Sequence, residues 1–321
     1  MSTVRNYLSL IRFSHTIFAM PFAMIGFFLG AYPVVFRITS KWETWVPKNI
    51  SASEWAWLTM SGWQLAGKLA LVLLCMVFAR SAAMAFNRWL DVKWDALNPR
   101  TAIREIPKGI ISKNSALRFV IINCLLFILC TWFINLVCFE LSFVALAVVL
   151  GYSYTKRFTP LCHLVLGLGL SLAPIGAYLA VTGRFDLLPI LFSLTVIFWV
   201  SGFDIIYALQ DEEFDRSNRL YSMPAWLGKA KALRVSELLH LLSTLCVVTA
   251  GLYGGFGVWY WIGVSFFVGT LVYQHIIVKP NDLSRVNLAF MTANGIASVV
   301  FSVFVIADLC FQTPCDIMRI F

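Results

Sequence analysis

Residues 65–95 read LAGKLALVLLCMVFARSAAMAFNRWLDVKWD. The part at 65–86 is almost wholly apolar, and it is about as long as the ~20 residues that a helix needs to cross a bilayer. It is followed by Asn87, Asp91 and Asp95, which recur at every fourth residue and would share one face of a continuous helix. Acidic groups at this spacing repel one another and are costly beside lipid. We therefore expect a membrane-spanning helix whose acidic end is compensated by a cation.

A second acidic stretch, DIIYALQDEEFD at residues 204–215, closes another apolar run. If this stretch is also a continuous helix, Asp204, Asp211 and Asp215 share one of its faces. Magnesium is the simplest compensating cation, because it prefers hard carboxylate oxygens and commonly shares its coordination with phosphate. The predicted Mg²⁺ ligands are Asn87, Asp91, Asp95, Asp211 and Asp215.

The composition is that of a membrane protein, with 60% hydrophobic and 13% charged residues. Soluble domains carry about twice this charged fraction. Apolar runs, mostly close to the length of a bilayer-spanning helix, occupy residues 16–36, 65–86, 117–137, 141–155, 162–181, 188–209, 236–255, 259–278 and 287–310. We predict an all-α, polytopic membrane protein of about nine transmembrane helices.

The basic residues predict the orientation of these helices, because cytoplasmic loops retain most of the Lys and Arg. In the nine-helix topology, most Lys and Arg fall on the side that holds the N-terminus and both acidic stretches. We therefore expect this side to be cytoplasmic, in a bacterial inner membrane. The net charge of +9 then follows from topology and lipid contact, so neither a nucleic-acid partner nor an obligate protein partner is expected.

The positions of the two acidic stretches suggest an internal duplication. They share the same four-residue register and are separated by four predicted helices, which keeps both on one side of the membrane. Residues 1–321 are therefore predicted to form a single integral domain. It would contain two parallel four-helix repeats, at about 16–155 and 162–278, around a shared cavity, with a last helix after them.

Basic side chains accompany both acidic stretches. Guanidinium and ammonium groups beside carboxylates on one membrane face can hold a diphosphate together with Mg²⁺. A diphosphate site that opens onto an apolar bundle indicates a substrate with a lipid tail, namely a polyprenyl diphosphate. The residues predicted to bind the diphosphate are Arg100, Arg104, Lys156 and Arg157.

Arg80 lies inside the apolar run at 65–86, seven residues before Asn87 and so on the same helical face. A buried arginine requires an anionic partner. Two partners are open: Asp204, in a structural pair, or the carboxylate of an aromatic acid substrate. We count Arg80 among the candidate substrate-binding residues.

Two segments carry a family resemblance. NRWLDVKWDALNPRTAIREIPKG at 87–109 and DIIYALQDEEFDRSNRLYSMPAWLG at 204–228 resemble the signatures of the UbiA superfamily of intramembrane prenyltransferases, and the opening IRFSHTIFAMPFA at 11–23 is also similar. The closest branch contains 4-hydroxybenzoate polyprenyltransferases and related enzymes proposed for the futalosine route to menaquinone. The resemblance implies nine helices around a lipid-open cavity, Mg²⁺ bound by both motifs, and C-prenylation of an aromatic ring.

The expected reaction transfers a polyprenyl group from its diphosphate to a ring carbon of an aromatic acid similar to 4-hydroxybenzoate, in ubiquinone or menaquinone biosynthesis. Mg²⁺ would make the diphosphate a better leaving group, and a dry cavity would protect the carbocation-like centre from water. Asp204 is placed to hydrogen-bond or deprotonate the phenol, with Tyr207 and Tyr154 as alternatives.

Other functions remain open at this point. The acceptor could instead be a dihydroxynaphthoate, a futalosine-pathway intermediate or haem. A transporter for diphosphates or lipids would also use a repeated helical bundle. The acidic residues, however, lie at helix ends and not at the midplane, which disfavours transport.

Overall fold

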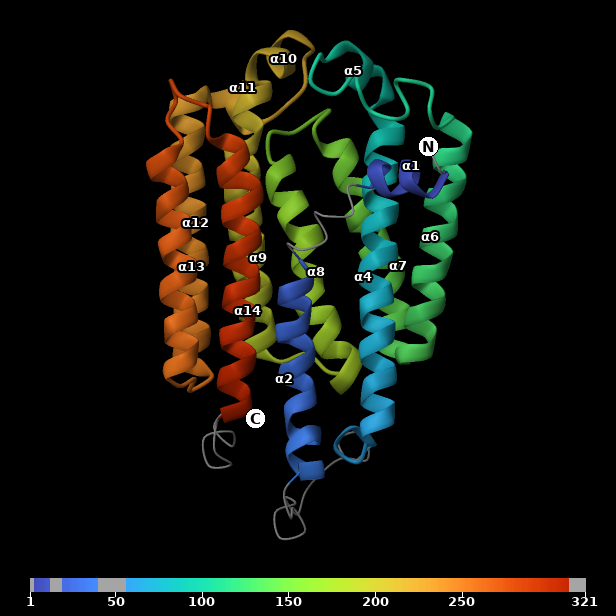
Figure 1. Ribbon diagram of the computed structural model, residues 1–321, viewed down its shortest axis with the longest axis vertical. Coiled ribbons are helices and arrows are strands. Elements are labelled where there is room, and N and C mark those ends of the chain that lie inside the picture. The colour runs from blue at the N-terminus through green and yellow to red at the C-terminus, as the bar shows by residue number, and fades with distance from the viewer. Residues whose placement is uncertain (1–2, 12–18, 40–55, 312–321) are drawn as a thin grey trace.

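The computed structural model describes residues 3–11, 19–39 and 56–311, and these form a bundle of long helices (Figure 1). The long helices are α2 (Met20–Thr39), α4 (Gly62–Leu90), α6 (Lys113–Ile134), α7 (Leu136–Thr155), α8 (Cys162–Thr182), α9 (Leu187–Ala208), α12 (Lys229–Tyr253), α13 (Val258–Ile277) and α14 (Asn294–Phe311). A π-helical stretch, η4 (Leu288–Ala293), leads into α14. The opening segment at 12–18 lies outside the described residues.

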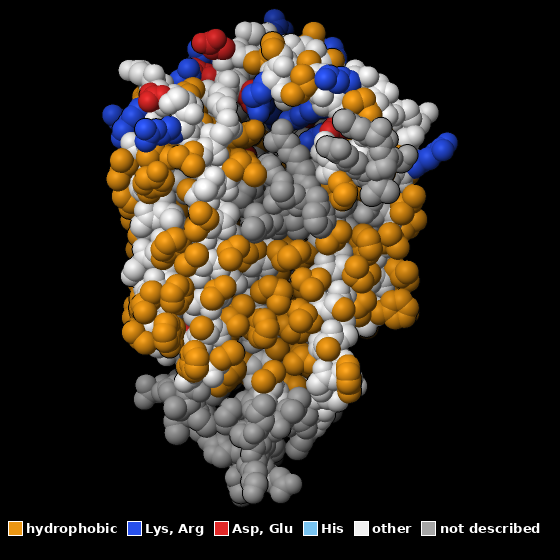
Figure 2. Space-filling view, viewed as in Figure 1, with side chains coloured by type: hydrophobic (Ala, Val, Ile, Leu, Met, Phe, Trp, Pro, Cys, Tyr) orange, Lys and Arg blue, Asp and Glu red, His pale blue; other side chains and the backbone are white. Residues whose placement is uncertain are grey.

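The described part of the chain contains 8 helices that are long and apolar enough to cross a membrane, and α2 contributes a shorter apolar helix, Met20–Val35. Figure 2 shows hydrophobic side chains spread over the sides of the bundle, while Lys, Arg, Asp and Glu gather toward one end. This division matches the apolar interior and polar boundary of a bilayer. The predicted fold class, an all-α polytopic membrane protein, is confirmed.

The boundary between the third and fourth predicted spans was wrong. The chain turns at Asn135, which separates α6 from α7, so the fourth span is a full 20 residues and not the short run at 141–155. The Asn135 side chain accepts a hydrogen bond from Cys138 N at 2.8 Å and donates one to Leu179 O at 2.9 Å. Side-chain caps of this kind satisfy backbone groups that would otherwise be unpaired, so a turn of one residue is sufficient.

An aromatic core fixes the position of α9. Phe22, Trp199, Phe267 and Phe301 are fully buried together, and the ring centroids of Phe22 and Trp199 lie 5.2 Å apart. On the opposite side of α9, a Cβ added at Gly167 of α8 would lie 2.5 Å from Ile197 O, so only glycine allows this close approach. The residues at the end of α9 are therefore held by two tightly packed interfaces.

Four short elements connect the long helices at one end of the bundle. They are α5 (Val92–Leu97), the 3₁₀ turn η3 (Leu209–Asp211), α10 (Glu212–Ser217) and α11 (Met223–Leu227). Helix α1 (Thr3–Leu10) lies across the same end (Figure 1). Both acidic stretches are therefore on one side of the bundle. The proposed duplication into two four-helix repeats stays a prediction.

Candidate active site

The first acidic stretch is not a continuous helix. Helix α4 ends at Leu90, and Asp91 (φ −93°, ψ 12°) caps this end and precedes the separate helix α5. The expectation that Asn87, Asp91 and Asp95 share one uninterrupted helical face was therefore wrong. The break turns α5 across the end of the bundle, where Asp95 is buried.

The second stretch is interrupted in a similar way. Asp204 and Tyr207 belong to α9, Asp211 ends the 3₁₀ turn η3, and Asp215 belongs to α10. The expectation of a single acidic face here was also wrong, because the turn rotates the later carboxylates away from the axis of α9. Asp215 is nevertheless completely buried, and Asp211 is nearly so.

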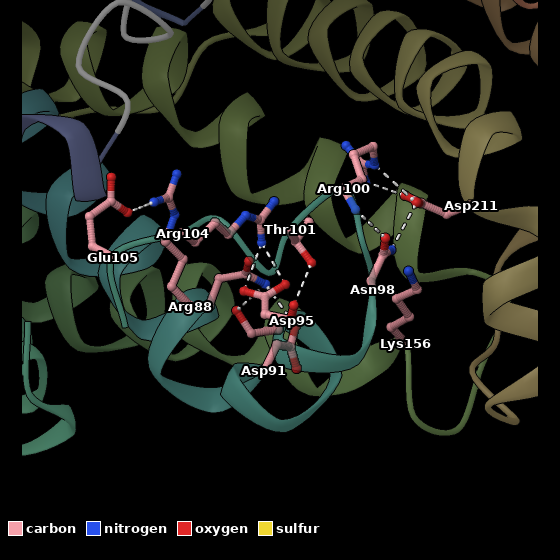
Figure 3. Close-up of polar contacts among 12 residues, drawn as sticks. Arg88, Asp91, Asp95, Asn98, Arg100, Thr101, Arg104, Glu105, Lys156 and Asp211 are labelled. Carbon is pink, nitrogen blue, oxygen red and sulfur yellow. Dashed lines mark hydrogen bonds and ion pairs between the residues drawn. The ribbon is translucent and has the colours of Figure 1, made fainter. Parts of the chain in front are cut away.

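Four ion pairs join the predicted metal ligands to the predicted diphosphate-binding residues. Each of the four aspartates contacts a different basic side chain, and Figure 3 shows Arg104 directed at Asp95 and Arg100 directed at Asp211. The four pairs are Asp91–Arg157 at 3.3 Å, Asp95–Arg104 at 2.7 Å, Asp211–Arg100, and Asp215–Lys156 at 2.7 Å. The structure thus brings the two sets together, with their formal charges balanced.

Arg100 and Asn98 connect the two acidic stretches. Arg100 Nε donates to Asp211 Oδ1 at 3.1 Å, and its Nη1 donates to the Tyr207 hydroxyl at 2.8 Å. Asn98 Nδ2 donates to the same carboxylate at 3.3 Å (Figure 3). The loop after α5 is therefore tied directly to the end of α9.

The loop between α7 and α8 supplies the other two basic side chains of the ion pairs, Lys156 and Arg157. Lys156 pairs with Asp215, while the guanidinium of Arg157 lies 4.5 Å from the Trp94 ring and 5.3 Å from the Tyr154 ring. Tyr154, one candidate for the catalytic base, is 42% exposed. It contacts Arg157 and is not among the residues that line the cavity described below.

Burial changes the ionisation of this cluster. It raises the pKa of Asp91 to about 6, because burial disfavours the charged carboxylate more than the nearby Arg157 favours it. Burial is also the largest single effect on Lys156 and acts to lower its pKa, but the charge and hydrogen bond of Asp215, together with the charge of Asp211, outweigh it and the net shift of the pKa is upward. A cation placed beside Asp91 would favour its ionised form.

A cavity of about 500 Å³ lies between α4, α6, α7 and α8 and is lined mainly by apolar side chains. Its polar lining includes five residues near the ends of α4 and α9 and in the loop after α5: Asn87, Arg88, Arg104, Asp204 and Tyr207. The amide of Asn87 donates to Asp91 Oδ2 at 3.4 Å, which connects this lining with the ion-pair cluster. Polar groups thus line the cavity where it meets the cluster.

Arg80 lines the cavity two helical turns deeper than Asn87. Its buried Nε has no hydrogen-bond partner, and no acidic side chain within the described ranges forms an ion pair with it. Asp204 instead contacts His163, with 2.6 Å between Asp204 Oδ2 and His163 Nδ1. Of the two partners considered for Arg80, the structural pair with Asp204 is absent from the described residues.

Sequence reasoning missed two residues of this site. Asn98 binds Asp211, and its only sequence signal is the Asn98-Pro99 helix break. His163 was also missed, although it contacts Asp204. A histidine at the first turn of a span, with an aspartate at the end of the next span, is the signal that could have indicated this contact.

The donor chemistry of the site suits a hard divalent cation, since carboxylate and amide oxygens are what Mg²⁺ prefers. Within the part of the chain that the structure describes, no three Asp, Glu, His or Cys side chains lie close enough to hold a metal ion. Each of the four aspartates instead contacts a basic side chain.

Comparison with known proteins identifies the family. The model of the UbiA prenyltransferase family matches residues 49–296. The chain is 29% identical over 238 residues to a 4-hydroxybenzoate octaprenyltransferase of Francisella tularensis subsp. novicida, covering 74% of this chain and 84% of the relative. It is 27% identical over 248 residues to the enzyme of the same name from Aeromonas salmonicida, covering 77% and 86% of the two chains.

Two solved structures have the same fold. The apo structure of a UbiA homolog from Aeropyrum pernix K1 has a TM-score of 0.71 and 26% identity, covering 92% of this chain and 97% of the homolog. A UbiA homolog from Archaeoglobus fulgidus bound to DMAPP and Mg²⁺ has a TM-score of 0.68 and 21% identity, covering 96% and 100%. The chain belongs to the UbiA prenyltransferase family and is a prenyl-transferring enzyme built into a membrane.

Proposed function

We propose that this enzyme transfers a polyprenyl group from polyprenyl diphosphate to a ring carbon of a 4-hydroxybenzoate-like aromatic acid, with Mg²⁺, for quinone biosynthesis. The observation that carries this proposal is one cavity that connects the ion-pair cluster, the unpaired Arg80 and an apolar chamber. These three parts match the diphosphate, the acceptor carboxylate and the prenyl tail. The balance of positive charge predicts that the cluster faces the cytoplasm, at a bacterial inner membrane.

The four ion pairs suit a diphosphate head group. Four basic residues exchange their aspartates for phosphate oxygens: Arg100, Arg104, Lys156 and Arg157. Guanidinium groups bind phosphate in the same bidentate geometry as carboxylate, and the Lys156 ammonium acts as a point charge. The released aspartates, together with Asn87, then offer oxygen ligands to Mg²⁺. Mg²⁺ held by these ligands would neutralise the diphosphate and make it a better leaving group. We therefore expect metal and diphosphate to bind together, and the A. fulgidus homolog was solved bound to DMAPP and Mg²⁺.

The allylic end of the prenyl chain lies beside aromatic rings. Tyr207 and Phe290 both line the cavity, with centroids 4.1 Å apart. The apolar walls exclude water from the positive charge that develops as the allylic C–O bond breaks. Because Tyr154 is exposed and away from the cavity lining, Asp204 and Tyr207 are the favoured partners of the acceptor phenol.

Arg80 supports an acidic acceptor, since a buried guanidinium without an anionic partner is costly unless a ligand supplies one. The names of the relatives agree with 4-hydroxybenzoate. Dihydroxynaphthoate, a futalosine-pathway acid and haem are the acceptors to compare with it.

Purified enzyme in detergent, given polyprenyl diphosphate, Mg²⁺ and each acceptor in turn, tests the proposal. No prenylation of any aromatic acid would contradict it. The transporter alternative is not supported, because the family is enzymatic.

Arg80→Met is expected to raise the acceptor KM by roughly 30-fold while leaving the KM of the prenyl diphosphate nearly unchanged, because a buried charge-assisted pair contributes ~2 kcal/mol or more. The matched ligand is 4-hydroxybenzamide, which lacks the carboxylate. Wild-type enzyme should prefer the acid, and the variant should lose this preference. Thermal stability should be unchanged or higher, since an unpaired charge is removed. Undiminished preference for the acid would exclude Arg80 from acceptor binding.

Gly176→Phe is expected to reduce the use of long prenyl chains. Gly176 lines the cavity roughly 20 Å along α8 from His163, and an added Cβ there meets no atom within 4 Å. A phenyl ring would occupy space that we assign to the tail, lowering the ratio of long-chain to short-chain kcat/KM by about tenfold. Gly67→Phe, at an exposed glycine of α4 away from the cavity, is the control. Equal ratios in the two variants would place the tail elsewhere.

A further inference from the structure

His163 is a buried side chain at the first turn of α8, only 3% exposed. Its Nδ1 lies 2.6 Å from Oδ2 of Asp204. Asp204 lines the cavity, whereas His163 does not. The histidine therefore contacts the acidic group nearest the proposed acceptor but is itself kept from the substrate.

The backbone around His163 determines which ring nitrogen carries the proton. The Met223 N–H donates to His163 Nε2 at 3.3 Å, so Nε2 presents a lone pair. The proton of the neutral ring is then on Nδ1, where it is donated to Asp204. Within the described residues, Asp204 Oδ1 forms no hydrogen bond, so this oxygen is available to the cavity.

The histidine is also fixed from the side of the ion-pair cluster. Met223 is the first residue of α11, and the N-cap of this helix, Ser222, donates its hydroxyl to Asp215 Oδ2 at 2.9 Å. On the other side, the Ser201 hydroxyl lies 3.1 Å from the backbone oxygen of His163 and 2.6 Å from that of Ile197. Three elements, α8, α9 and α11, thus hold one imidazole, and through it one carboxylate.

We propose that His163 is a positioning residue for the prenyl transfer. Its Nδ1–H donates a hydrogen bond to Oδ2 of Asp204, and this bond orients Oδ1 toward the acceptor phenol. This role rests on the proposed function, in which Asp204 is the base. The phenol proton passes to Asp204, and the ortho carbon forms a C–C bond to the allylic carbon as its C–O bond breaks. The diphosphate leaves with the electron pair. The released diphosphate takes the ring C–H proton, and Asp204 returns its proton to the phenolate oxygen.

Asparagine and glutamine provide a matched pair of substitutions for His163, because their side-chain amides reach different positions of the imidazole ring. His163→Asn places an N–H donor where Nδ1 was and keeps the bond to Asp204. His163→Gln places its amide near the Nε2 position, so it keeps the contact with Met223 but loses the one with Asp204. We expect His163→Gln to lower kcat roughly 10- to 100-fold with little change in either KM, because a positioned base contributes 10²–10⁴-fold. His163→Asn should recover most of the rate.

A merely structural role would predict parallel losses in both variants, and that result would overturn the proposal. A substrate-free measurement separates this proposal from the function on which it rests. Melting temperatures of His163→Gln, Asp204→Asn and the double variant should be non-additive if the pair exists. Additive changes would overturn the positioning role whatever the acceptor is. The melting temperatures of the variants could be non-additive while the wild-type enzyme prenylates no phenol. That combination would overturn the proposal too, because Asp204 would then have no proton to accept.

Discussion

Excess EDTA is expected to abolish prenyl transfer, and added Mg²⁺ or Mn²⁺ should restore it. Without a metal, only the basic side chains stabilise the leaving diphosphate, so the rate should fall by at least ~10³-fold. The four aspartates already have basic partners, which means the fold does not need the metal. The melting temperature should therefore be the same with and without EDTA. Full activity in excess chelator would contradict the metal-dependent mechanism.

The same ion pairs predict how metal and diphosphate bind. Mg²⁺ alone competes with four resident cations for the carboxylates, and should raise the melting temperature little. Inorganic diphosphate alone would expose four aspartates to one another. The two together should give the largest stabilisation, because ligands that bind only the folded state stabilise it by mass action. A large shift with Mg²⁺ alone would mean that a preformed metal site exists.

Much of the fold was predictable from the sequence because membrane helices are defined by length and apolarity, and both can be read without tertiary contacts. All nine predicted spans correspond to helices, eight of them long enough to span by themselves. The errors lie at polar turns. Asn135 separates two spans, and its side chain caps the second of them. Asp91 interrupts the helix that the four-residue spacing of the acidic residues had predicted to be continuous.

The candidate site was predicted as a list of residues but not as a geometry. The sequence predicted that the aspartates and the basic residues lie on the same side of the membrane, and the structure brings them together at one end of the bundle (Figure 1). The sequence could not show that each aspartate would pair with one particular basic residue, because Arg100 and Asp211 are brought together only when the fold places the loop after α5 beside the end of α9. The same is true of His163 and Asp204, which lie on adjacent helices.

Asp91→Asn and Asp211→Asn are expected to lower kcat/KM for the prenyl diphosphate by about 10²–10³-fold, because each removes a carboxylate proposed to face the metal–diphosphate unit. Asparagine keeps the size of the side chain, so the loss is one of charge. The control is Glu213→Gln in α10, which is exposed and should retain nearly full activity.

Glu212→Gln distinguishes a catalytic loss from a structural one. Glu212 is buried and pairs with Arg216 at 2.7 Å and Lys229 at 3.8 Å, connecting α10 to α12. Its substitution should lower the melting temperature more than the turnover of the folded enzyme, since it removes an ion pair away from the cavity lining. Equal losses of kcat/KM in all four variants would show that the acidic segments act as one charged surface, without the separate roles that the ion pairs assign to them.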